Sequence, residues 1–67
     1  MFTNAELTTH MTRLSKFAYK LTQNSAEAED LLQSTLLRAI EKQHLFRDNT
    51  NLYSWLSKIM YNLFSNS

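Results

Sequence analysis

The sequence predicts an all-α protein, a compact three-helix domain with helices at about 4–22, 25–43 and 51–64. Three observations lead to this prediction. Apolar residues recur at spacings of three and four along each segment, which is the period of an amphipathic helix. Short polar stretches that contain capping residues separate the segments. A length of 67 residues, 43% of them hydrophobic and 19% charged, suits one small globular domain.

The first helix is expected to begin at a capping box, Thr3-x-x-Glu6, in which each side chain satisfies a free backbone amide. Arg13, Lys16 and Lys20 fall opposite the apolar residues. We interpret them as a solvated basic face, with a stripe that follows DNA as the alternative. The residues of the apolar stripe are Leu7, Met11, Leu14, Ala18 and Leu21, with Phe17 beside it.

The spacing of Asn24 and Glu27 predicts the start of the second helix. Its first turns also hold Glu29 and Asp30, and carboxylates there stabilise the positive end of the helix dipole. Its apolar face consists of Ala28, Leu31, Leu32, Thr35, Leu36, Ala39 and Ile40. At 100° per residue, the opposite side holds Asp30, Gln33, Ser34, Leu37 and Glu41. Leu37 is therefore a large apolar residue among polar ones. It is either an ordinary exposed leucine or a contact for a partner helix.

A connector at 44–50 carries two apolar anchors, Leu45 and Phe46, and Thr50 or Asn51 is expected to cap the third helix. Trp55 lies at the edge of the apolar arc, where its ring meets solvent or a base. The arc is interpreted as core rather than as a ligand-binding surface, and consists of Leu52, Trp55, Leu56, Ile59, Met60, Leu63 and Phe64. The polar side holds Ser54, Ser57, Lys58, Tyr61 and Asn62.

The composition excludes several classes of function. Without Gly there is no phosphate-binding loop, and without Cys there is no disulfide, thiol nucleophile or cysteine-bound zinc. His10 and His44 lie far apart, so we expect no metal site and no cofactor. A small convex domain has little room for a pocket that excludes water, so we expect no enzymatic activity. No secretion signal or membrane-spanning run is present, which predicts a cytoplasmic protein without a membrane partner. The net charge of +1 predicts DNA binding only where another protein supplies positive charge.

Two motif blocks carry a resemblance to a known family. The first block consists of Leu21-Thr22 followed by AEDLLQSTLLRA at 28–39. The second block is TNLYSWLSKIMYN at 50–62, and it is joined to the first by Phe46-Arg47. Together they resemble the second conserved domain of bacterial sigma factors, specifically region 2 of the extracytoplasmic-function (ECF) group in the sigma-70 family. The resemblance runs from about 14 to 64 and implies one region 2-like domain over 1–67. The family's second DNA-binding domain, region 4, has no counterpart in these residues, so we expect one domain of a longer factor.

The resemblance implies docking on RNA polymerase core, through the clamp helices of its largest subunit. The family's contact positions correspond to Asp30, Gln33 and Ser34, on the helix face that also presents Leu37. A carboxylate accepts from an arginine, and a carboxamide both donates and accepts, which suits this kind of contact. Ser34 stands where the family usually has Glu, so one charge contact is expected to be weaker.

The resemblance also implies binding of promoter DNA, as the single-stranded non-template minus-ten element with one base extruded into a pocket. Asn62 is expected to recognise the base edge and Ile59 to shape the pocket. Phe46 either shares that role or, as we favour, anchors the loop in the core. Arg47 and Lys58 are expected to contact phosphates. The residues implied for DNA binding are Lys42, Phe46, Arg47, Asp48, Asn49, Thr50, Trp55, Lys58, Ile59 and Asn62.

Asn49 is the position where the sequence departs from the family in the loop, because many relatives have Gly there. After Gly, Asn is the residue that best tolerates left-handed backbone, so we expect the loop to keep its turn. Three functions stay open. The leading one is a promoter-recognition domain that docks on polymerase and binds or melts the minus-ten element. The alternatives are a sigma-like module that binds an anti-sigma factor without reading DNA, and a helical bundle with no nucleic-acid role. An anti-sigma factor is a partner under either of the first two.

Overall fold

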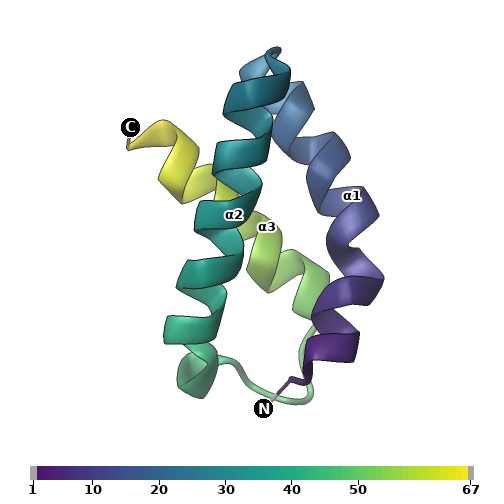
Figure 1. The fold of residues 1–67 in the computed structure, drawn as a ribbon. Coiled ribbons are helices and arrows are strands. Elements are labelled where there is room, and N and C mark those ends of the chain that lie inside the picture. The colour runs from purple at the N-terminus through teal and green to yellow at the C-terminus, as the bar shows by residue number, and fades with distance from the viewer. Residues whose placement is uncertain (1, 67) are drawn as a thin grey trace.

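Three helices make up the structure, a computed structural model that describes residues 2–66. In chain order the elements are α1 (Asn4–Thr22), α2 (Ser25–Glu41), the 3-10 turn η1 (Gln43–Leu45) and α3 (Leu52–Ser65). α1 and α2 are joined by a tight turn and run antiparallel, while α3 crosses and packs against both (Figure 1). The prediction of an all-α three-helix domain is confirmed. Within residues 2–66, none of the helices is long and apolar enough to cross a lipid bilayer.

The helix starts follow from the capping residues. The Glu6 amide donates to Thr3 Oγ1 (3.2 Å) and the Thr3 amide donates to Glu6 Oε1 (3.0 Å), which completes the predicted capping box. Asn24 and Asn51 cap α2 and α3 through their Oδ1 atoms, each accepting from a backbone amide at 2.9 Å. Of the two candidates for the third cap, the structure therefore uses Asn51. Each such cap stabilises the fold by about 1 kcal/mol.

The end of α2 differs from the prediction, and the left-handed residue after α1 was not predicted. α2 ends at Glu41, and the chain tightens into η1 rather than continuing the α-helix to residue 43. The left-handed residue is Gln23, with φ 56° and ψ 28°, directly after α1. Among residues 2–66 it is the one position with positive φ, so Asn49, where many relatives have Gly, does not adopt left-handed backbone. The turn of 47–50 is instead closed by the Thr50 amide on the Arg47 carbonyl oxygen (3.0 Å), with negative φ at Asn49.

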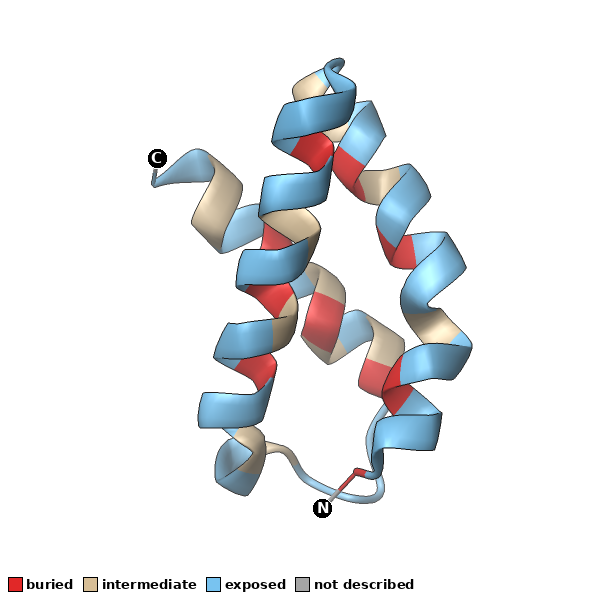
Figure 2. Cartoon of the chain, in the orientation of Figure 1, coloured by how far each residue is buried: buried red, intermediate tan, exposed pale blue. Residues whose placement is uncertain are grey.

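The core lies where the inward faces of the three helices meet (Figure 2). Thr35 is buried there with its hydroxyl satisfied, since Oγ1 donates to the Leu31 carbonyl oxygen at 2.7 Å. Ile40 was expected in this face but is 47% exposed, because it follows the buried Ala39 by one residue, a rotation of 100° past the edge of the core. Met11 is likewise 36% exposed. The fully buried side chains are Leu14, Ala18, Thr35, Ala39, Leu56 and Met60.

An aromatic cluster fixes the connector between η1 and α3. Phe2 is only 8% exposed and packs edge-on against Phe46, with ring centroids 5.8 Å apart. Trp55 completes the cluster at 5.7 Å from Phe2 and 5.3 Å from Phe46. Phe46 therefore anchors the connector against the core, which is the role we favoured for it. Phe2 was absent from the predicted core, although it precedes the capping box where an apolar residue commonly packs back on the helix.

Candidate functional site

The surface along α2 and the C-terminal half of α3 is hollowed in three adjoining places. Leu63 lines all three hollows, so it lies at their meeting point. The remaining lining residues differ between the hollows in charge and in polarity. These differences divide the predicted site residues into separate groups.

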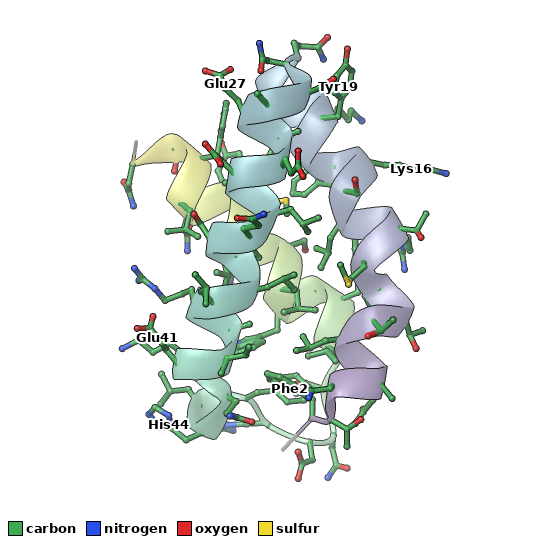
Figure 3. All side chains as sticks on the ribbon, viewed as in Figure 1. Phe2, Lys16, Tyr19, Glu27, Glu41 and His44 are labelled. Atoms are coloured by element: carbon green, nitrogen blue, oxygen red, sulfur yellow. The ribbon has the colours of Figure 1, made fainter. Side chains whose placement is uncertain are left out.

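The largest hollow, of about 480 Å³, has an apolar floor and an acidic edge, and we call it the acidic hollow. Its carboxylates are those of Glu27 and Asp30, in the first turns of α2. Figure 3 shows Glu27 at the end of α2 nearest the α1–α2 turn. This arrangement favours an apolar group that carries a neighbouring positive charge. The hollow is lined by Leu21, Thr22, Glu27, Asp30, Leu31, Ser34, Leu63 and Phe64.

The face of α2 predicted to meet polymerase is fully accessible. Asp30, Gln33, Ser34 and Leu37, which we call the outer face, are all exposed, and Leu37 reaches 66% exposure. Asp30 and Ser34 belong to the acidic hollow. Ser34 and Leu37 line a second depression of about 360 Å³, the outer hollow, which is completed by Arg38, Glu41 and Leu63. The structure thus brings three of the four predicted residues into two adjacent hollows.

The third hollow, of about 280 Å³, lies at the other end of the same seam, and we call it the basic hollow. Two cations from the last turn of α2 and its cap rim it, apolar groups form its walls, and two amide side chains one turn apart on α3 add donors and acceptors. This is the combination that stacks a flat ring, pairs with its edge and attracts an anion. It is lined by Arg38, Lys42, Leu45, Trp55, Ile59, Asn62, Leu63 and Asn66.

Four of the residues predicted for DNA binding meet in the basic hollow, namely Lys42, Trp55, Ile59 and Asn62. The others lie elsewhere. Phe46 is turned into the aromatic cluster, Lys58 is exposed on α3, and residues 47–50 form the turn before that helix.

Sequence reasoning missed four lining residues of this hollow, namely Arg38, Leu45, Asn66 and Leu63, the last of which was predicted only as a core residue. Two of them were detectable from helical spacing. Arg38 precedes Lys42 by four residues and Asn66 follows Asn62 by four, so each lies one turn from a predicted residue. Leu45 offered no such signal because it belongs to η1, beyond the point where the α-helical period ends.

The predicted basic face of α1 is only partly a solvated face. Lys16 points away from the bundle (Figure 3), and Lys20 is exposed. The Arg13 guanidinium, in contrast, lies 3.8 Å from the centroid of the Tyr53 ring, a cation–π contact that ties α1 to α3. Arg13 therefore has a structural contact that the helical wheel did not predict. Within residues 2–66, no three His, Cys, Asp or Glu side chains are grouped so as to hold a metal ion.

Comparison with known proteins places these features in context. The family model described as Sigma-70 region 2 matches residues 7–67. The ECF RNA polymerase sigma factor EcfG of Rhodopseudomonas palustris (strain TIE-1) is 45% identical over 51 residues, which is 76% of this chain. The match spans 28% of that relative's length.

Proposed function

This chain belongs to the sigma-70 region 2 family, and on that premise we propose that it is the promoter-recognition domain of an RNA polymerase sigma factor. The similarity to a protein named as an ECF sigma factor supports the ECF group that the motifs predicted. In this proposal the domain is a non-enzymatic, cytoplasmic factor. The observation that carries the proposal is the basic hollow, where residues from two separate motif blocks converge.

Docking on polymerase is proposed for the outer face. Its carboxylate, carboxamide and hydroxyl groups are all exposed and available to a partner helix, and Leu37 adds an apolar anchor. The proposed partner is the clamp helices of the largest polymerase subunit. Substituting Asp30 and Gln33 together with Ala should abolish capture of these helices in a pulldown. Lys16→Ala, at an exposed position of α1 that points away from the bundle, is the control. Unchanged capture by the double variant would overturn this docking surface.

Binding of the single-stranded minus-ten element is proposed for the basic hollow. Trp55 and Ile59 offer apolar surface to a base, and Asn62 offers an amide to its edge. Lys42 supplies positive charge for phosphates in the hollow itself. Arg47 and Lys58 lie outside its lining, so their proposed phosphate contacts are to a strand that extends beyond the hollow. Because the net charge is only +1, polymerase is expected to supply the rest of the attraction to DNA.

Fluorescence anisotropy with a labelled single-stranded minus-ten oligonucleotide tests this second role, in the presence and absence of polymerase core. Asn62→Ala should weaken binding about tenfold, since a well-placed side-chain contact to a base is worth about 1–3 kcal/mol. Asn4→Ala, the same substitution at an exposed position of α1, should leave the affinity unchanged.

The alternative is a module that binds an anti-sigma factor without reading DNA. The low net charge and the acidic hollow favour it, because both suit a basic protein partner better than a phosphate backbone. A complete lack of oligonucleotide binding, even with polymerase present, would support this alternative and overturn the promoter-binding role.

A further inference from the structure

Arg38 lies on the ridge between the basic hollow and the outer hollow. On one side it shares the basic hollow with Lys42 and Asn62. On the other it shares the outer hollow with Leu37 and Glu41, beside the proposed docking face. A side chain in this position is accessible to ligands of both hollows.

Arg38 is paired within the molecule. Its Nε lies 3.4 Å from Glu41 Oε1, one helical turn away, and the two side chains are 49% and 67% exposed. Such an exposed pair is weak, because water and salt screen both charges. A phosphate competes strongly with Glu41 for the Arg38 guanidinium, because the guanidinium can donate two parallel hydrogen bonds to phosphate oxygens.

Helix stability does not account for Glu41. It is the last residue of α2, where the negative end of the helix dipole disfavours a carboxylate. Its carboxylate also lies one residue from Lys42 at the rim of the basic hollow. The pair with Arg38 offsets the unfavourable position, but it does so by occupying a cation that borders the proposed nucleic-acid site.

We propose that Arg38 is a phosphate-contacting residue of the basic hollow and that Glu41 restrains it until the polymerase partner proposed for the outer face engages Glu41 in the outer hollow. This inference rests on the proposed function, in which the basic hollow takes single-stranded nucleic acid. A positive group of the partner that pairs with Glu41 releases Arg38 toward the phosphate. Because binding free energies are linked, nucleic acid that holds Arg38 also frees Glu41 for the partner.

The first test measures the affinity of the full 67-residue chain for a fluorescein-labelled oligothymidylate single strand of about twelve nucleotides, at low salt. Glu41→Gln should tighten binding about two- to fivefold, the range that corresponds to releasing an exposed ion pair. Glu29→Gln removes the same charge from another side of α2 and should change the affinity less than about 1.5-fold. Equal effects of the two substitutions would mean that net charge alone is responsible, and would overturn the inference.

The second test asks whether Glu41 acts through Arg38. Arg38→Ala should weaken binding about threefold or more and reduce the slope of log affinity against log salt by about 0.7, as expected for one lost phosphate contact on a single strand. In the Arg38→Ala background, Glu41→Gln should have no further effect. If its tightening persists there, Glu41 repels the phosphates directly and the restraint on Arg38 is refuted.

These outcomes are separate from a failure of the proposed function. If the wild-type chain binds no single strand, with or without polymerase core, the nucleic-acid role fails and this inference fails with it. If the wild type binds and Asn62→Ala weakens it while Arg38→Ala does not, the proposed function stands and the role of Arg38 is overturned. Circular dichroism should confirm that each variant keeps the wild-type helix content and thermal midpoint.

Discussion

The acidic and basic hollows lie on the same seam between α2 and α3 and share Leu63, yet they present opposite charges. Glu27 and Asp30 edge the first, and Arg38 and Lys42 rim the second. Their separation explains how a chain with a net charge of only +1 can have a locally basic surface. A ligand responds to the local charge of the surface that it contacts, and the net charge of the whole chain does not report that local charge.

The two charge groups also follow the direction of α2. Carboxylates lie in its first turns and cations in its last turn and cap, which is the arrangement that complements the helix dipole. The same side chains therefore stabilise the helix and set the chemistry of the two hollows. Substitutions that act on both hollows together, or on one alone, can test how independent they are.

The largest effect is expected from the core that both hollows share. Leu56→Ala removes a fully buried side chain of α3 and should cost about 2–5 kcal/mol, because it leaves a cavity as well as losing apolar burial. Urea denaturation followed by helical circular dichroism measures this loss, and binding at both hollows should decline with it. Leu37→Ala, the same change at a 66% exposed site, should alter the stability by less than about 0.5 kcal/mol. A comparable loss in both variants would contradict the assignment of the core.

Reversing one charge in each hollow should show that the basic hollow and the acidic hollow act independently in binding. Lys42→Glu is expected to weaken single-stranded DNA binding about tenfold, since it removes a phosphate contact and adds repulsion, while capture of polymerase stays unchanged. Asp30→Lys should have the opposite profile, with weaker capture of polymerase and no loss of DNA binding. Anisotropy titration and pulldown on both variants measure the two activities. If either substitution impairs both activities equally in folded protein, the hollows are not independent.

A smaller effect, confined to the basic side, is expected from the aromatic cluster. Phe2→Leu keeps an apolar side chain but loses ring packing, at a cost of about 0.5–1.5 kcal/mol. Because Trp55 is the one tryptophan of the sequence and packs against Phe2, its fluorescence should shift to longer wavelength. Phe64→Leu, in the lining of the acidic hollow, should leave that emission unchanged. An unchanged spectrum in Phe2→Leu would place Phe2 away from Trp55 in solution.

The smallest effect is expected at the turn beside the acidic hollow. Gln23→Gly relieves the left-handed backbone and should stabilise the domain by about 0.5 kcal/mol, which raises the thermal midpoint by a few degrees. The gain is limited by the lost hydrogen bond from Gln23 Nε2 to the Lys20 carbonyl oxygen and by the added freedom of the unfolded chain. Asn49→Gly, at a residue with negative φ, should not stabilise. The reverse ranking of these two variants would contradict the backbone conformations of Gln23 and Asn49 described above.

The sequence predicted what depends on local pattern. Capping residues such as Thr3 and Asn24 make their hydrogen bonds within one turn of the chain, so short motifs locate the helix starts. Helix ends are harder to predict, because Gln23 is left-handed without being the residue type that favours this backbone. Asn49 stands where many relatives have Gly, yet the turn of 47–50 closes without left-handed backbone.

Tertiary packing accounts for the remaining differences. Phe2 contacts Trp55 and Arg13 contacts Tyr53, and both partners lie on α3, at least 40 positions later in the chain. The helical period of the sequence cannot predict contacts between such distant residues. The same applies to the site. The family resemblance selected Ile59 and Asn62 on α3, and the packing of α2 against α3 brings Arg38 to the same hollow.

Leu63 has a consequence for how this domain can diversify. Because its side chain lines all three hollows, a change in its size alters every surface on the seam at once. In contrast, Glu27 and Lys42 each line one hollow, so a substitution at either residue changes the charge of that hollow and leaves the other hollow unchanged. New binding specificities are therefore expected to arise through the charged residues. Leu63 is expected to vary less, because a substitution there would change all three hollows together.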